Sequence, residues 1–364
     1  MISPPASRGC AGYNCVVSGE RIDADRRQFL LTMGSLVAVA TGCSSSCGTS
    51  RTAGNAKVPA AVPNEPARTS RPRVVVVRAK QALTHGYDAD RGALRAMLGA
   101  GLAALAGTGD GMAGLRRYFQ AGQTVGLKVN GLAGRNAATH VELVDELSAL
   151  LRQMDIGGHQ QVVFDRFASD LTASGFALSD HGDSYRCTGN DALGYEEEPT
   201  VMPSSASRLA RVLTERVDAV LNLPVLKQHM LSGMSGALKN QFGCIHNPNK
   251  MHLDKCDPYI AEVNALPAIR QKQRLIVMDA LRPVVDNGPS YQPGMAEVAN
   301  ALLFAVDPVA VDVVGLELLE ELRRKRGLPS LDKVDLSPTH IQTSARMGLG
   351  VGDRGAIDVV SIEV

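Results

Sequence analysis

The sequence predicts an α/β protein in which a largely parallel sheet is flanked by helices. Continuous β-branched runs, such as the valines at 74–77, indicate strands that are buried on both faces. Longer stretches with apolar residues at helical spacing separate these runs, as the crossovers between parallel strands require. Several runs also end in a polar residue, and ligands of parallel sheets bind beyond such carboxyl ends.

The order of the elements follows from hydrophobic periodicity and from helix start and stop signals. Strands are predicted at 74–77, 124–129, 161–164, 218–222, 275–278 and 357–363, and helices at 89–106, 139–153, 308–326 and 338–347. Thr139 is placed to cap the second helix, with Glu142 at the capping-box position. Asp307 is placed to cap the third, which has Pro308 in its first turn and Gly327 after its end.

The composition is that of a globular protein and excludes several classes of function. The chain has 364 residues, of which 45% are hydrophobic, enough for one large or two medium domains. Its 38 basic and 37 acidic residues give a net charge of +1, so neither nucleic acid nor an anionic membrane surface is an expected partner. The seven cysteines include no Cys-x-x-Cys pair, so we expect neither an iron–sulfur cluster within this chain nor a disulfide scaffold.

The N-terminal region resembles a twin-arginine export signal. Arg26 and Arg27 precede an apolar stretch that runs to about Ala40, and small residues then lead to Cys43. The apolar stretch is too short to span a bilayer as a helix, which takes about 20 residues. Cys43 is a candidate lipidation site, although Ala40 stands where lipoprotein signals prefer Leu, Val or Ile.

These features predict three parts of the chain. They are a signal at 1–43, a disordered linker rich in Ser, Thr, Ala, Pro and Gly at 44–72, and a folded domain at 73–364. We expect the twin-arginine machinery to export the protein, which would then be periplasmic or held at the membrane through its signal or a lipid on Cys43.

Polar residues stand at the carboxyl ends of the predicted strands. They are Lys128, Asn130, Asp165, Asn222 and Asp279. Each of them alone fits a loop residue or a cap. Because the carboxyl ends of parallel strands share one edge of a sheet, we expect these side chains to line a common cleft.

Residues 222–256 have the composition of an anion-binding segment. They contain three histidines and four lysines against one aspartate. Lys239 and Asn240 follow a Ser-Gly-x-Ser-Gly-Ala stretch, whose small residues let the backbone approach a ligand closely. The spacing is not that of a P-loop. We infer a site in which lysine supplies charge and backbone N–H groups supply geometry for a phosphate or carboxylate.

Blocks of the sequence also resemble those of a known family, in the same order. The blocks are Leu223-Pro-x-Leu-Lys227-x-His229, Ser235-Gly-Ala-Leu-Lys239-Asn240-x-Phe-Gly243, Lys250-x-His252, Asp279-Ala-Leu-Arg282 with Gly288-Pro289, and Asp307-Pro-Val-Ala-Val-Asp312. From about Arg73 to the C-terminus the chain resembles the DUF362 family of bacterial and archaeal proteins of undefined function, and its leader fits an exported branch. Some members are fused to ferredoxin-like iron–sulfur domains, which are not expected here.

A second pattern is similar to the core of the nickel-pincer lactate racemases. It consists of Lys227-x-His229, then Ser-Gly-x-x-Lys239, then a downstream histidine. The likeness implies that Lys239 would anchor a metal cofactor and that His246 or His252 would bind its metal. The downstream spacing departs from that family's pattern.

Four residues form a candidate metal-binding pattern, C-x-H-x5-H-x3-C. They are Cys244, His246, His252 and Cys256, and such ligands suit Zn²⁺ or a similar ion. A buried structural Cys244 and a turn at His246 explain the same residues without a metal. A histidine beside a lysine is held neutral near pH 7, as a base or a metal ligand must be.

These observations predict an enzyme that acts on a small anionic substrate, through oxidoreductase or racemase-like chemistry, with a metal ion or metal cofactor left open. The predicted catalytic residues are His229, His252, Lys239 and Asp279, and the predicted substrate-binding residues are Lys128, Asn130, Asp165, Lys227, Ser235 and Asn240. The alternative is a non-catalytic periplasmic binding protein for an anionic ligand or a metal complex. A purely structural protein would show no clustering of these side chains.

Overall fold

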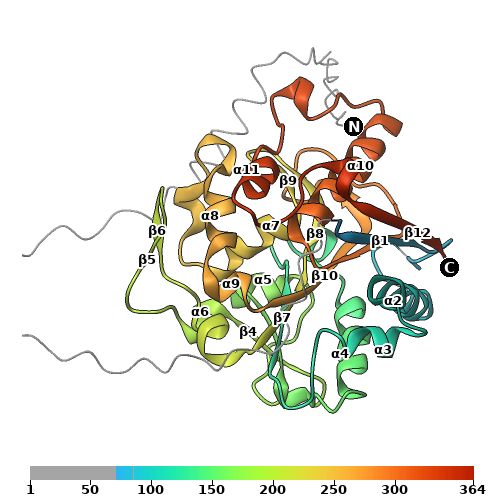
Figure 1. Ribbon diagram of the computed structural model, residues 1–364, viewed down its shortest axis with the longest axis vertical. Helices are drawn as coiled ribbons and strands as arrows, with labels where there is room; N and C mark the ends of the chain where they lie inside the picture. Colours follow the sequence, from blue (N-terminus) through green and yellow to red (C-terminus); the bar gives the residue numbers. More distant parts are fainter. Residues whose placement is uncertain (1–70, 85) are drawn as a thin grey trace, which may run out of the picture. The chain divides into compact units, whose positions relative to one another are not determined.

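A mixed, mostly parallel sheet forms the centre of the protein (Figure 1). The structure is a computed structural model, and it describes residues 71–84 and 86–364. Within these residues the sheet has ten strands. In spatial order its main path consists of β12 (Asp358–Glu363), β1 (Arg73–Arg78), β11 (Ala301–Ala305), β10 (Gln273–Val284), β7 (Ala219–Leu223), β2 (Val125–Val129), β3 (Gln161–Asp165) and β4 (Arg186–Gly189).

The predicted α/β class with a largely parallel sheet is confirmed. From β10 to β4 every neighbouring pair on the main path is parallel, and so is the edge pair of β1 and β12. The exception is β11, which runs antiparallel to both β1 and β10. The central strands β2, β3 and β7 are buried along their whole length, as continuous apolar runs predict.

Helices cover both faces of the sheet and enclose two hydrophobic cores (Figure 1). One face carries α2 (Arg91–Ala106), α3 (Gly111–Leu115) and α4 (Val141–Arg152), and the other carries α7 (Ala237–Asn240), α8 (Tyr259–Ala265), α9 (Pro267–Arg270), α10 (Pro308–Lys325) and α11 (His340–Arg346). The remaining elements are α5 (Ala168–Ala173), α6 (Asn190–Leu193) and the two-stranded pair of β5 (Thr200–Val201) and β6 (Ala206–Ser207).

Short helical turns connect these elements. They are η1 (Arg135–Ala137), η2 (Gly158–Gln160), η3 (Val212–Arg216), η4 (Gln241–Cys244), η5 (Pro248–Met251), η6 (Asp254–Cys256), η7 (Asp332–Val334) and η8 (Arg354–Ala356). Three of them, η4, η5 and η6, lie in the segment 222–256 that the sequence analysis singles out.

The predicted helix caps have different outcomes. Asp307 caps α10 as expected, because its side chain accepts hydrogen bonds from the N–H groups of Val309 and Ala310. The prediction for Thr139 is wrong: α4 begins one residue later, with His140 at the N-cap position. The Thr139 hydroxyl instead donates a hydrogen bond to the carbonyl of Leu223, the last residue of β7.

A hairpin extends the sheet above the carboxyl end of β7. It consists of β8 (Val225–His229), parallel to β10, and β9 (Gly233–Ser235), antiparallel to β8. Lys227 lies opposite Ser235 in this hairpin, and His229 lies opposite Gly233. The hairpin therefore carries three of the predicted site residues, Lys227, His229 and Ser235, to the edge of the sheet where ligands of parallel sheets bind.

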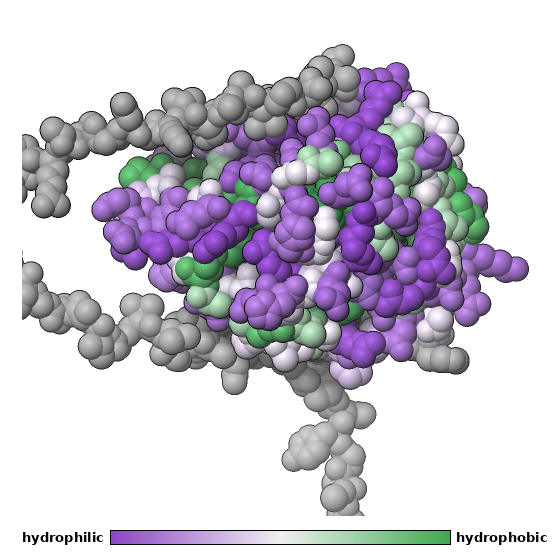
Figure 2. All heavy atoms as spheres, turned by 90° about the horizontal axis from the view of Figure 1, so that it is seen from below, coloured by the Kyte–Doolittle hydropathy of each residue, from purple (hydrophilic) through white to green (hydrophobic). Residues whose placement is uncertain are grey.

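The surface of the described chain is mixed. The face seen in Figure 2 is largely hydrophilic, with hydrophobic side chains in small separate groups. No helix among residues 71–84 and 86–364 combines the length and the apolar character that a membrane crossing needs. The predicted export signal, Cys43 and nearly all of the predicted linker lie outside the described residues and stay predictions.

Candidate functional site

A buried ion pair joins the carboxyl ends of β2 and β3. The Lys128 ammonium lies 2.8 Å from Asp165 Oδ1 and donates to the Val129 carbonyl at 2.8 Å. The second carboxylate oxygen of Asp165 accepts the backbone N–H of Gly131 at 2.7 Å. Both charges are thus compensated and hydrogen-bonded inside the protein, which is the condition under which a buried ion pair is tolerated.

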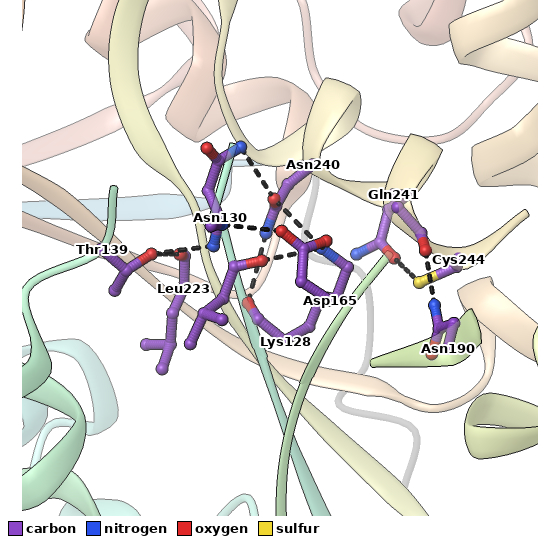
Figure 3. A network of polar contacts seen from close by, with 12 residues as sticks. Lys128, Asn130, Thr139, Asp165, Asn190, Leu223, Asn240, Gln241 and Cys244 are labelled. Carbon is purple, nitrogen blue, oxygen red and sulfur yellow. Dashed lines mark hydrogen bonds and ion pairs between the residues drawn. The ribbon is translucent and has the colours of Figure 1, made fainter. Parts of the chain in front are cut away.

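Carboxamide side chains connect this ion pair to α7 and to the neighbouring strands (Figure 3). Asn240 Oδ1 lies 3.3 Å from the Lys128 ammonium, and its Nδ2 donates to the Lys128 carbonyl and to Asn222 Oδ1. Asn222 in turn donates to Gln273 Oε1, which also accepts from Gln241. This chain of hydrogen bonds fixes α7 against the ends of β2 and β7.

Lys227 is satisfied by uncharged acceptors. Its ammonium donates to Asn130 Oδ1 at 2.9 Å and to the carbonyls of Leu132 and Ala137 at 3.2 and 3.0 Å. Burial lowers the pKa of Lys227 to about 7. The three acceptors use the three donors of the ammonium, so Lys227 holds the loop after β2 in place.

Asp312 of α10 fixes the beginning of α7. Its carboxylate accepts the N–H groups of Ala237 at 2.6 Å and of Leu238 at 3.0 Å. A Cβ atom at Gly236 would overlap this carboxylate. Glycine is therefore required in the Ser-Gly-Ala-Leu-Lys block, because Asp312 must reach the backbone that places Lys239.

A similar constraint applies to Gly243, at the other end of the same block. A Cβ atom there would overlap Asp165 Oδ1 and crowd the Lys128 ammonium. Both glycines thus serve the packing of buried carboxylates against the 235–243 segment. Contacts within the protein therefore explain both glycines of the segment, whether or not the segment also binds a ligand.

Lys239 differs from the other two buried lysines because, among the described residues, its ammonium has neither the carboxylate that pairs with Lys128 nor the three oxygen acceptors that bind Lys227. It is 7% exposed, and its ammonium lies 3.2 Å from His252 Nε2, 3.9 Å from Cys256 Sγ and 4.4 Å from the centre of the Phe242 ring. No carboxylate of the described residues lies within 4.0 Å of it. Burial lowers the pKa of Lys239, since desolvation disfavours its charged form.

The hydrogen bonds of His252 define its tautomer. Its Nδ1 faces the carbonyls of Pro248 and Asn249 at 3.1 and 3.3 Å, so Nδ1 carries the proton. Burial, together with the charge of Lys239, lowers the pKa of His252 to about 3, and the ring is neutral at pH 7. Its Nε2 lone pair therefore accepts a hydrogen bond from the Lys239 ammonium.

His229 has the opposite tautomer. Its Nδ1 accepts the N–H groups of Leu231 at 3.1 Å and Ser232 at 3.3 Å, so the proton of the neutral ring is on Nε2. Burial and the nearby Lys239 charge keep the pKa of His229 well below its usual value. The rings of His229 and His252 are stacked with their centres 6.0 Å apart.

Two further residues border this lysine–histidine cluster and are missing from the prediction. His340 of α11 is 0% exposed, and burial together with the Lys239 charge lowers its pKa to about 3. Arg166 follows β3 directly and donates to Asn249 Oδ1 at 3.2 Å. Arg166 directly follows a predicted strand, so the rule that identified the other strand-end residues could also have identified Arg166. The region around His340 carries no motif.

Asp279 lies away from this cluster. Its carboxylate accepts the backbone N–H of His140 at 2.9 Å and contacts the ring Nδ1 of the same residue at 2.7 Å. Burial opposes charge on His140, but the Asp279 carboxylate outweighs it and raises the pKa of the ring. Neighbouring odd-numbered residues of β10, Val277 and Leu281, face the core under α2 and α4, opposite the face that carries α7.

The four residues of the predicted metal pattern do not gather around one point. Cys244 donates to Gln241 Oε1 at 3.3 Å, and exposed His246 packs against the Tyr195 ring. Cys256 lies beside Lys239. Among the residues that the structure describes, no group of three or more His, Cys, Asp or Glu side chains is arranged to hold a metal ion.

The structure thus brings most of the predicted residues together in two adjoining groups. Lys128, Asn130, Asp165, Lys227 and Asn240 form the hydrogen-bonded network, and His229, Lys239 and His252 form the lysine–histidine cluster. The described residues thus form an α/β protein in which a buried ion pair and a cluster of lysine and histidine side chains adjoin at the carboxyl ends of parallel strands.

The chain belongs to the family described as "Domain of unknown function (DUF362)", whose family model matches residues 125–317. The search of curated proteins found no match. Among solved structures, a crystal structure of a protein from Thermotoga maritima, a structural genomics target, is similar with a TM-score of 0.37 at 9% sequence identity. The similarity covers 72% of this chain and 60% of that one.

The requirement for glycine at position 236 can be tested. Gly236→Ala should lower the free energy of unfolding by about 2 kcal/mol, because the new methyl group displaces the Asp312 carboxylate from two buried N–H groups. Gly99→Ala in α2 is the matched control, since nothing lies within 4 Å of the added carbon, and it should stabilise by up to about 1 kcal/mol. Equal stability of the two variants in urea unfolding would contradict the assignment.

The ion pair makes a second prediction. Lys128→Met should cost about 3–5 kcal/mol of unfolding free energy, because it leaves Asp165 charged, buried and unpaired. Adding Asp165→Asn to this variant should restore part of the loss, since the charge is then removed from both sides. Guanidinium unfolding measures both values. A double variant less stable than Lys128→Met alone would show that the charge of Asp165 is compensated elsewhere.

Proposed function

We propose that this protein is an enzyme that acts on a small anionic substrate bound at Lys239. The observation that carries the proposal is the buried Lys239 ammonium without a carboxylate partner among the described residues. An uncompensated buried charge is costly, and such groups are concentrated at functional sites. An anionic group of the substrate supplies the missing charge.

The two histidines beside Lys239 suit proton transfer in opposite directions. Neutral His229 has its proton on Nε2, so this atom donates a hydrogen bond or a proton. Neutral His252 has its lone pair on Nε2, which accepts a hydrogen bond from Lys239. A site with one donor and one acceptor can give a proton to one part of a substrate and take one from another.

The other predicted residues support this site in different ways. Lys128, Asp165, Asn130 and Asn240 build the frame that holds α7, and Lys227 fixes the loop after β2. We assign to them the shape and positive potential of the site rather than direct substrate contact, because their polar atoms are largely occupied within the protein.

The proposal predicts that loss of the Lys239 charge makes the protein more stable but weakens its binding of anions. Lys239→Met should raise the melting temperature of the free protein, because it removes an unpaired buried charge, and should weaken acetate and inorganic phosphate binding at least tenfold in calorimetry. Lys250→Met is the matched control: its lysine is exposed, and the change should leave both anions bound as in the wild type. Unchanged anion affinity in Lys239→Met would contradict the proposal.

A second arm of this experiment separates an enzyme from a binding protein. Turnover of pooled small carboxylates and phosphate esters is followed by NMR for the wild type and for His229→Gln. An enzyme loses turnover in His229→Gln while still binding anions, because the proton donor is removed and Lys239 remains. Full turnover in His229→Gln would remove this histidine from the mechanism.

A further inference from the structure

Arg166 is a second cation at the same edge of the sheet. It directly follows β3, and its guanidinium lies 4.4 Å from the centre of the Phe167 ring. One nitrogen donates to Asn249 Oδ1 at 3.2 Å, and the Nε atom is buried without a hydrogen-bond partner among the described residues. An arginine with a free buried N–H can still bind a ligand.

The charge of Arg166 is only distantly compensated. No carboxylate in the described part of the chain lies within 4.0 Å of its guanidinium. Both oxygens of neighbouring Asp165 are occupied, one by Lys128 and the other by the Gly131 N–H. Tyr195, Asp170 and Asp165 act on Arg166 electrostatically, but neither aspartate forms an ion pair with it.

Lys239 contacts His252 directly, and Arg166 is connected to His252 through Asn249. The Lys239 ammonium contacts Nε2 of the ring, and the Asn249 carbonyl faces Nδ1. The Asn249 side chain is the group that Arg166 holds. Both cations act on His252: after burial, the Lys239 and Arg166 charges are among the causes that lower its pKa.

We propose that Arg166 is a second anion-binding residue of the Lys239 site, and that the substrate class is a small molecule with two anionic groups, such as a dicarboxylate. The inference rests on the proposed function and goes beyond it by naming the charge and the two binding points of the substrate. Lysine presents a point charge, while the planar guanidinium can grip a carboxylate with two parallel hydrogen bonds. The neutral imidazole of His252 contacts Lys239 directly and the Asn249 carbonyl on its other nitrogen, so it lies beside the group that Lys239 would bind.

A purely structural role for Arg166 would act through Asn249. In that role the arginine holds the 248–252 turn, and the turn holds His252 in place. Asn249→Ala removes the same hydrogen bond and keeps the arginine charge. It therefore separates positioning of the turn from direct binding of an anion.

The test compares acids that differ by one carboxylate. Malonate, succinate and glutarate are titrated by calorimetry beside propionate, butyrate and valerate, which have the same numbers of carbon atoms. The wild type should bind at least one dicarboxylate about tenfold more tightly than the monocarboxylate with the same number of carbon atoms. Arg166→Met should abolish this preference and leave the monocarboxylates unchanged. Arg166→Lys should retain part of the preference for dicarboxylates, because lysine keeps the positive charge but cannot form the two parallel hydrogen bonds of a guanidinium.

Two control variants complete the design. Arg208→Met removes an exposed arginine that acts on His246, and it should change neither series of acids. Asn249→Ala should keep the preference for dicarboxylates. If Asn249→Ala loses the preference as Arg166→Met does, or if Arg166→Met weakens both series equally, Arg166 does not bind the second anionic group.

Failure of this inference is distinguishable from failure of the proposed function. If Lys239→Met weakens the binding of monocarboxylates while the wild type shows no preference for any dicarboxylate, the anion site stands and Arg166 is not part of it. If Lys239→Met binds every acid as the wild type does, the anion site itself is absent and the assignment of Arg166 falls with it.

Discussion

The buried ion pair between Lys128 and Asp165 is the constraint on which the site depends. It places a cation and an anion at the ends of two adjacent parallel strands, and Asn240 binds to the cation. Because Asn240 is in α7, this contact also places the preceding residue, Lys239. The strand ends, the ion pair and α7 therefore form one rigid frame, which holds an uncompensated lysine beside two neutral histidines.

The three buried lysines of the site show why residue type alone is a poor guide to role. The sequence presents each of them as a candidate for binding an anion. The structure shows that Lys128 is neutralised by Asp165 and that Lys227 is satisfied by one side chain and two backbone carbonyls. Lys239 is the member of the three without such partners among the described residues. The partners are distant in sequence or belong to the backbone, so no local pattern reveals them.

The parallel sheet and its long helices follow from the hydrophobic periodicity, and the strand-end residues Lys128, Asn130 and Asp165 do lie close together as expected. The position of a residue at a strand end does not show on which face of the sheet its side chain lies. Asp279 was expected in the site, but its side chain binds His140 on the other face of the sheet. Thr139 carries a capping signal, but its hydroxyl binds the carbonyl of Leu223 in β7. That residue is distant in sequence, so only the folded structure reveals this contact. The β8–β9 hairpin was not predicted, since its residues lack a strand period, and His340 reaches the site only because α11 packs there.

The most direct test of this account is the pKa of the Lys239 ammonium in the unliganded protein. It is measured by NMR on protein labelled at lysine, with Lys239→Met to assign the signal. The account predicts a pKa below the ordinary lysine value of 10.5, which rises when a bound anion supplies the missing charge. Affinity for the anion should accordingly fall as the pH rises through that pKa. A pKa at or above 10.5 without ligand would mean that the charge of Lys239 is already compensated, and would contradict the proposed site.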